Sequence, residues 1–473
     1  MRRFEVRKAK RRRGARKRFA GCAATCVVCL SSLASAEPAE RGYHPDRFSL
    51  VAKSESHVGL FQRALLPGPR GTLITTETVV PLEQYVLLDA RGLDTGWDED
   101  SVDVEFSGYG QVALGALEDE QRLDGDIQTF FVRYRRGPAQ VQLGRQIAMS
   151  PAARYVRFDG AAVGAELGLG LDVNTYGGFT VLPRWNRAPG YASLGGLPEA
   201  RVEDPRVLQT VSRSGYWLAG GRLGYSQDVV GGGLSFHEQR EDTELARRNL
   251  GLDLRAGPWQ TATLGSNALF DTDATRFADA RVWVDAEPWD PLNVSVEYLH
   301  TEPALLLSRQ SVLSVFGGSG YEEVSGSAEL EVTPALSFEG EGGFEIYDEG
   351  RPGSRGEVGG RFLADRLRRV VVRLGYARLI APENGYQSLR GGLSSRLMPA
   401  VSGTLEVYAY FYDEAIRGYR SSTVYAGTLG YQATPQLDVL WGGSIARSPY
   451  ASLDAQTQLR LRYAFDSSLE ARK

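Results

Sequence analysis

In a central part of the chain, the acidic or basic side chains of each segment occupy alternate positions and therefore share one face. Their grouping could create an electric field. Side chains of this kind must find an opposite charge or water, because an unpaired charge in apolar surroundings is very costly. Either the acids and bases pair across adjacent segments, which we prefer, or separate acidic and basic arcs select solutes by charge. The acidic members are Glu323, Glu329, Glu331, Glu339, Glu341 and Glu345, and the basic members that follow are Arg361, Arg373, Arg390 and Arg396.

Catalytic and metal-binding chemistry has weaker support. The chain has 4 histidines, His44, His57, His237 and His300, and none forms an HExxH motif or pairs with another at ligand spacing. No phosphate-binding glycine loop or nucleophile-elbow motif occurs in a suitable context. His237 or His300 beside a serine could still supply the base of a rim hydrolase, which we keep as an alternative. The sequence therefore predicts no enzyme activity, no metal site and no cofactor.

The segments that carry the charged residues alternate apolar and polar positions with a period of two. Residues 459–465, for example, place leucines and aromatic residues on one face and Arg460 and Arg462 on the other. This pattern indicates β-strands with one apolar face and one polar face. Beyond residue 36, no apolar stretch approaches the length that a membrane-spanning helix needs.

The connections between these segments alternate in length. Short turns such as Gly137-Pro138 and Thr434-Pro435 are separated by longer polar connections. Tight turns on one rim and longer loops on the other are typical of outer-membrane barrels. Residues 101–465 would hold about 20 strands, and residues 72–92 could add a hairpin, which gives a range of roughly 18–22. The predicted fold class is all-β, a transmembrane antiparallel up-and-down β-barrel.

In such a barrel the charged faces should line a wet lumen, because a basic residue at the lipid face near mid-membrane costs about 2–4 kcal/mol. The connection 183–214 is long and locally basic, and long loops are usually functional, so we expect part of it to narrow the mouth. The pore-lining candidates are Glu329, Glu331, Glu339, Glu341, Arg361, Arg373, Arg390 and Arg396, and the constriction-loop candidates are Arg184, Arg187, Arg201 and Arg206.

Residues 1–36 have the pattern of a secretory signal peptide. Eleven basic residues precede an apolar run, and Ala34-Ser35-Ala36 offers small residues at the expected cleavage positions. All 3 cysteines lie in this leader, so cleavage near Ala36 leaves no disulfide or thiolate metal site. Loss of eleven bases and one acid changes the net charge from -4 to -14, which disfavours nucleic acid as a partner.

The expected organisation has four parts. A signal peptide (1–36) is followed by a periplasmic segment with a possible extra hairpin (37–100), an outer-membrane barrel (101–465) and a C-terminal tail (466–473). Residues 37–100 are too few for the plug domain of a siderophore-type transporter, so an energised transporter is not expected. The predicted location is the bacterial outer membrane.

One segment resembles a known group of barrels. Residues 141–162 read VQLGRQIAMSPAARYVRFDGAA and contain Gly144-Arg145-Gln146, Arg154 and Arg157-Phe158-Asp159-Gly160. These elements resemble the strand–loop–strand segment of porin-like barrels, including the alginate-export type. The resemblance implies passive conduction of hydrophilic solutes, or of a secreted polysaccharide, across the outer membrane.

The last strand, which ends at Phe465, resembles the assembly signal of bacterial outer-membrane proteins, although DSSLEARK follows where the aromatic residue is usually terminal. The expected partners are therefore outer-membrane lipid, the transported solute and the barrel-assembly machinery. A structural or adhesive barrel with a filled lumen is a further alternative. The sequence leaves open the solute, the pore size, the gating, the exact strand number, whether the lumen is open, and whether the protein is a monomer or a trimer.

Overall fold

The computed structural model describes residues 48–65, 76–94, 100–115, 123–181, 216–259, 261–306, 320–347, 350–365, 369–382, 384–449 and 451–467. All of them belong to one compact unit, His44–Lys473. The predicted leader (1–36) and the predicted constriction loop (183–214) lie outside the described residues.

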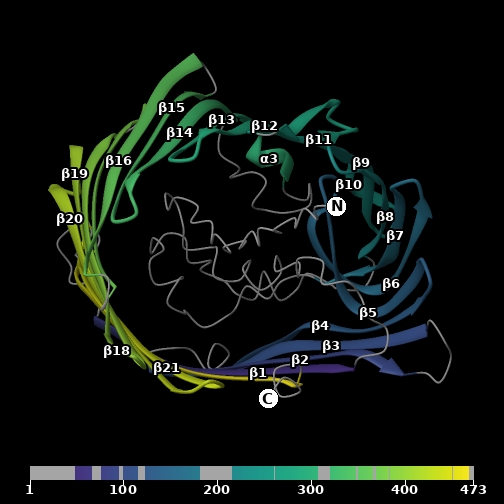
Figure 1. Cartoon of the computed structure of the whole chain (residues 1–473), viewed down its shortest axis with the longest axis horizontal. Coiled ribbons are helices and arrows are strands. Elements are labelled where there is room, and N and C mark those ends of the chain that lie inside the picture. Colours follow the sequence, from purple (N-terminus) through teal and green to yellow (C-terminus); the bar gives the residue numbers. More distant parts are fainter. Residues whose placement is uncertain are drawn as a thin grey trace, which may run out of the picture. The chain divides into compact units, whose positions relative to one another are not determined.

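Twenty-two strands form one antiparallel sheet in which each strand pairs with the next along the chain. β1 also pairs with β22, from Val51 opposite Asp466 to Leu65 opposite Ala451, and this ladder closes the sheet into a barrel (Figure 1). The strands are β1 (Ser49–Leu65), β2 (Thr76–Asp94), β3 (Asp100–Gly115), β4 (Leu123–Arg136), β5 (Ala139–Ser150), β6 (Arg154–Gly168), β7 (Leu171–Thr180), β8 (Tyr216–Ser226), β9 (Val230–Glu241), β10 (Glu244–Trp259), β11 (Ala262–Asp271), β12 (Arg276–Trp289), β13 (Leu292–Thr301), β14 (Tyr321–Thr333), β15 (Leu336–Tyr347), β16 (Arg351–Asp365), β17 (Val370–Ile380), β18 (Tyr386–Met398), β19 (Val401–Ile416), β20 (Tyr419–Thr434), β21 (Leu437–Arg447) and β22 (Ala451–Asp466).

The predicted fold class is confirmed, and the strand number is at the upper end of the expected range. The extra hairpin begins earlier than residues 72–92, because β1 starts at Ser49 and β2 at Thr76. β1 supplies the partner of the last strand, so this hairpin is required for closure of the wall.

One face of the wall exposes large apolar side chains on almost every strand. Leu374 is 67% exposed, Leu405 62% and Val358 60%, whereas Glu323 and Glu345 on the opposite face are only 7% exposed. A protein surrounded by water rarely exposes so continuous an apolar surface, whereas a lipid-facing barrel wall requires one. The apolar face is therefore the membrane side of a bacterial outer-membrane barrel, and the opposite face is called the inner wall below.

Among the described residues, no helix is long and apolar enough to cross a membrane. One short helix, α3 (Pro303–Leu306), follows β13.

The difference in length between the connections at the two rims is smaller than the sequence predicts. β9 and β10 are joined by the two residues Asp242 and Thr243, and β19 and β20 by Arg417 and Gly418, where longer connections were expected. Asp242 and Arg417 adopt positive φ angles of 51° and 50°, which close these turns tightly.

Candidate functional site

The inner wall of β14–β19 gathers the charged residues that the sequence groups by parity. On these strands the large apolar residues alternate with the charged ones and point to the lipid side. All eight pore-lining candidates occupy the opposite, inner face, and we call this surface, with Glu323, Glu345, Arg355, Glu357 and Glu406, the charged wall. Its part in selecting solutes stays a prediction.

Like charges lie directly opposite one another in the charged wall. The β14–β15 register places Glu329 beside Glu339, and the β16–β17 register places Arg361 beside Arg373. Facing residues in an antiparallel ladder are close enough to interact, and like charges there are destabilising. No ion pair links these four residues to an opposite charge within the described part of the chain. The preferred hypothesis of simple cross-strand neutralisation therefore does not describe this region.

Cross-strand neutralisation does occur nearer the other end of β14–β16, around Arg355. Its Nη2 atom lies 2.7 Å from Glu323 Oε1 and 2.8 Å from Glu341 Oε1. Glu323 faces Glu345 in the ladder, and Tyr347 donates its hydroxyl hydrogen to Glu345 at 2.5 Å. Sequence reasoning missed Arg355, although its odd number on β16 gives it the same parity as Arg361.

The two remaining arginine candidates have different partners. Arg390 Nη2 lies 3.8 Å from Glu406 Oε1, and its guanidinium covers the Tyr408 ring at 5.3 Å. Arg396 donates from Nε and Nη2 to the carbonyl oxygen of Pro399, at 3.0 and 2.5 Å. A carbonyl oxygen holds the guanidinium in place without neutralising its charge.

Tyrosines also line the inner wall near the longer-loop rim, and the sequence analysis did not single them out. The rings of Tyr321 and Tyr347 are 5.9 Å apart, and those of Tyr386 and Tyr410 are 5.6 Å apart. These residues share the parity of the charged wall, which was the signal that could have found them.

A second feature of the lumen is the β5–β6 hairpin, which leaves the wall at one end. The β4–β5 ladder stops at Phe130 opposite Arg145, and the β6–β7 ladder begins only at Phe158 opposite Thr180. In these ladders, residues 148–156 therefore pair only with each other. Gly144 permits the departure, because its φ is 122° and a Cβ there would collide with the Phe130 carbonyl oxygen.

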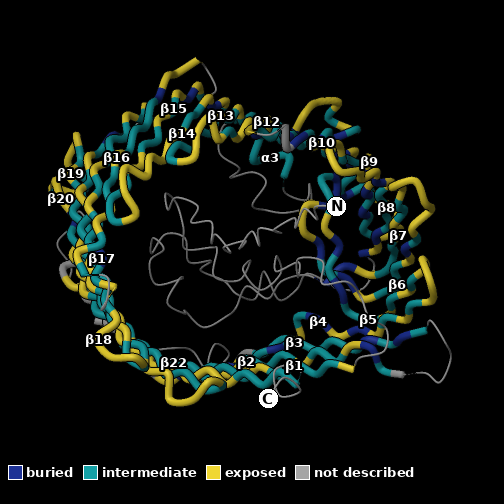
Figure 2. The backbone as a smooth tube through the Cα atoms, viewed as in Figure 1, coloured by how far each residue is buried: buried dark blue, intermediate teal, exposed yellow. Residues whose placement is uncertain are grey.

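The tip of this hairpin rests on the inner wall of β9 and β10. Ala152 donates its backbone N–H to Ser235 Oγ at 3.1 Å, and Asn249 Nδ2 donates to the Ala152 carbonyl oxygen at 3.2 Å. A small core with Phe158 and Leu218 packs beneath it, and buried residues gather where the hairpin meets β8–β10 (Figure 2). The hairpin is thus an inward-folded element built from the wall itself, at a place where sequence reasoning expected only a loop.

Ion pairs occupy the place where the ladder between β4 and β5 ends. Arg157 Nη2 lies 2.6 Å from Asp126 Oδ2, and Arg145 binds Asp159 through Nε and Nη2 at 2.7 and 2.8 Å. Arg145 also donates to the Ile127 carbonyl oxygen at 3.0 Å. Arg145, Arg157 and Asp159 belong to the porin-like segment 141–162. In this protein they form ion pairs and a backbone hydrogen bond at the place where β5 leaves β4.

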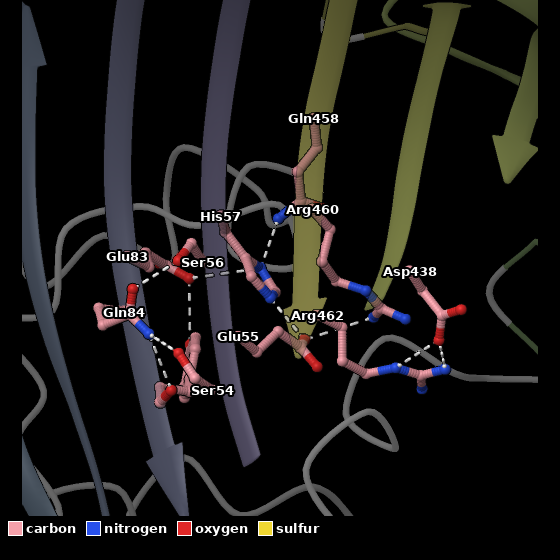
Figure 3. Close-up of polar contacts among 11 residues, drawn as sticks. Ser54, Glu55, Ser56, His57, Glu83, Gln84, Asp438, Gln458, Arg460 and Arg462 are labelled. Atoms are coloured by element: carbon pink, nitrogen blue, oxygen red, sulfur yellow. Dashed lines mark hydrogen bonds and ion pairs between the residues drawn. The ribbon is translucent and has the colours of Figure 1, made fainter. Parts of the chain in front are cut away.

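The closure seam between β1 and β22 carries polar contacts on the inner wall (Figure 3). Glu55 accepts contacts from His57 Nε2 at 2.5 Å and from Arg460 Nη1 at 3.5 Å. Arg462 donates from Nε and Nη2 to Asp438 Oδ2 on β21, at 3.2 and 2.5 Å. The seam therefore brings further arginines to the lumen beside those of the charged wall.

The histidines considered for rim catalysis do not adjoin a nucleophile. His237 is fully buried beneath the hairpin, with Nδ1 3.0 Å from Tyr176 Oη. His300 lies near Glu302 and Glu322, at 3.9 and 3.7 Å. Neither ring is hydrogen-bonded to a serine among the described residues. The same part of the chain holds no group of three or more acidic, histidine or cysteine side chains placed for a metal ion.

No family model matches the chain, and no curated protein matches it. The resemblance of residues 141–162 to alginate-export barrels therefore has no independent support.

Solved outer-membrane barrels are similar in fold. Pseudomonas aeruginosa OccK3 has a TM-score of 0.39 and 12% identity, with 88% of this chain and 96% of that chain covered. OccK2 from the same organism, solved in complex with glucuronate, has 0.40 and 15%, with 88% and 98% covered. The P pilus usher translocation pore has 0.46 and 10%, with 88% and 99% covered. Likeness at these levels carries no argument about function.

Proposed function

We propose that this barrel is a passive, porin-like channel for hydrophilic solutes in the outer membrane. One observation carries the proposal: like charges face each other on the inner wall, as Glu329 faces Glu339 and Arg361 faces Arg373. Each arrangement costs stability, and burying such charges in a dry lumen would cost far more. A water-filled passage accounts for both, because water solvates the charges and passing solutes experience their field.

The hairpin β1–β2 bears on the class of transporter. Barrels of about 22 strands commonly hold a separate plug domain. Here Ser49–Leu65 and Thr76–Asp94 are strands of the wall, so these residues are not available for a plug. Passive conduction narrowed by the inward β5–β6 hairpin is the simpler function.

A polysaccharide is the second candidate solute, and the inner tyrosines favour it. The pairs Tyr321–Tyr347 and Tyr386–Tyr410 place aromatic rings on the inner wall near acidic and basic groups. Sugar rings have apolar faces that can pack on aromatic rings, and hydroxyls that bind charged groups. We therefore propose a secreted polysaccharide, as in the alginate-export type of barrel, as the second candidate solute. The alternatives of an adhesive barrel and a rim hydrolase have no comparable observation.

Conductance across a planar bilayer tests the proposal. The purified full chain, shown to be folded by heat-modifiable gel migration, should produce discrete, ohmic current steps. An acidic oligosaccharide added to one side should interrupt the current if the solute is a saccharide, whereas a neutral dextran of the same length serves as the size control. A folded barrel without current steps would contradict the channel function and favour a filled, structural barrel.

A further inference from the structure

A cavity of 660 Å³ lies on the inner wall of β17–β22, close to the short turn between β18 and β19. The longest connections, between β7 and β8 and between β13 and β14, are at the opposite rim. Long loops mark the outer side of outer-membrane barrels, so the cavity is at the periplasmic end of the lumen. Four arginines and one acidic residue line it: Arg369, Arg396, Arg460, Arg462 and Asp438. The basic excess stands out in a chain whose formal net charge is -4.

Neighbouring groups hold three of these guanidinium groups in place. Arg462 is fixed by Asp438, the single acid of the lining, with two contacts to Oδ2. Arg460 reaches Glu55, whose Oε1 atom also binds His57. Arg396 is held by the carbonyl oxygen of Pro399, so its full charge is retained.

The fixed geometry leaves donors for a ligand. A guanidinium has five N–H groups, and Arg396 uses only two of its nitrogens on the Pro399 carbonyl. Planar guanidinium groups match carboxylate and phosphate oxygens in pairs, and they do so most effectively when they are already oriented. Hydroxyl groups of Ser394, Ser402 and Thr404 complete the lining beside the arginines.

We propose that this cavity is a binding site for an oxyanion carried on a hydroxylated carbon chain, such as a sugar acid or a sugar phosphate. The arginines bind the oxyanion, and the serine and threonine hydroxyls bind hydroxyl groups of the solute. The site would retain anionic solutes at the periplasmic end of the lumen. The inference rests on the proposed function in one respect only, namely that solutes reach the inner wall.

Calorimetric titration of the purified full chain in detergent, at low ionic strength, tests the site. Gluconate and glucose 6-phosphate distinguish a carboxylate from a phosphate ligand, and glucose is the neutral probe. We expect saturable binding of at least one anion and no binding of glucose. Arg396→Gln and Arg460→Gln should each weaken the anion about tenfold, because a charge-assisted hydrogen bond is lost.

Two further variants separate recognition from general effects on the barrel. Arg281→Gln removes an inner-wall arginine of β12, paired with Glu297 outside the cavity, and should leave the affinity unchanged. Arg396→Lys keeps the charge but not the fork of donors, so its affinity should fall between wild type and Arg396→Gln. All variants are first checked for heat-modifiable migration.

Equal binding of glucose, no binding of either anion, or unchanged affinity in the folded Arg396→Gln/Arg460→Gln double variant would overturn the site. Conduction is not needed for this measurement. A barrel that binds gluconate but carries no current would contradict only the proposed function, and a barrel that conducts but binds neither anion would contradict only this inference.

Discussion

The charged wall and the β4–β7 sector use the same types of charged side chain in different ways. In β14–β17 the ladder is continuous, and Glu329 and Glu339 face each other without an ion pair to a described residue. At the β4–β5 branch the ladder is interrupted, yet Asp126 and Arg157 form an ion pair at 2.6 Å. Charges are thus compensated where the ladder between β4 and β5 ends, whereas Glu329 and Glu339 remain opposed within a continuous ladder.

The difference separates structural charges from charges available to a solute. Where strands part, unpaired backbone groups at membrane depth must be satisfied, and Arg145 does this by donating to the Ile127 carbonyl oxygen. In a continuous ladder the backbone N–H and C=O groups bond to each other, so the inward side chains are not needed to bind them and can contact a solute. The wall of β14–β18 is therefore the better place to look for solute selection.

The largest expected effect concerns the branch in the sheet. Gly144→Val should strongly reduce the heat-modifiable, folded species, because the positive φ costs a branched residue about 1–3 kcal/mol and the side chain collides with the Phe130 carbonyl oxygen. Gly110→Val is the matched control, since a Cβ at Gly110 has no neighbour within 4 Å. Equal folded yields for the two variants would show that the branch does not depend on glycine.

A smaller effect is expected at the anchor of the hairpin. Asn249→Ala removes the bond to the Ala152 carbonyl oxygen, which should lower the free energy of unfolding by about 1–3 kcal/mol and increase single-channel conductance and current noise. Urea unfolding and single-channel recording measure the two effects. Asn174→Ala, which removes an exposed contact to Asp172 on β7, should change neither. A quiet, wild-type current in Asn249→Ala would mean that the hairpin tip does not limit the pore.

The charged wall itself is probed by reversing two of its bases. Arg373→Glu with Arg390→Glu should shift the reversal potential in a salt gradient toward cation selectivity, because both side chains are on the inner wall. The corresponding double glutamine variant should produce about half of that shift if the effect is electrostatic. An unchanged reversal potential would leave these arginines with a structural role only.

The smallest effect distinguishes opposed from compensated acids. Glu329→Gln should raise the free energy of unfolding by about 0.2–1 kcal/mol, because it relieves repulsion with Glu339. Glu323→Gln should lower it, because Glu323 is 2.7 Å from Arg355. Urea unfolding of both variants provides the comparison, and a shift in the same direction would remove the distinction drawn between the two groups.

Residue parity made the wall predictable from the sequence. A strand turns each successive side chain to the opposite face, so Arg373 and Arg390 had to share the face opposite the leucines. The same rule places Arg355 and Tyr410 opposite the exposed apolar residues of β16 and β19. The strand register could not be predicted from the sequence. The turn geometry that places Glu329 opposite Glu339 depends on backbone angles rather than on composition.

The inward hairpin could not have been read in the same way. Gly144 is one of 55 glycines, and nothing local marks it as the residue at which a strand leaves the sheet. The contact that makes the departure favourable, from Ala152 to Ser235, joins residues 83 positions apart. Long-range contacts of this kind are outside the range of any local pattern.

The seam between β1 and β22 has a consequence for biogenesis. Its contacts join the most distant parts of the chain: His57 and Gln458 are 401 positions apart, and Leu50 and Ser467 are 417 apart. Nearly the whole chain must therefore leave the ribosome and cross into the periplasm before the first strand can meet its final neighbour. Until then both edges carry unsatisfied backbone groups that hydrocarbon cannot solvate. Stepwise insertion of an open sheet into the membrane would thus be unfavourable. The chain should enter the membrane as the barrel closes, or while another protein surface pairs temporarily with the free edges of β1 and β22.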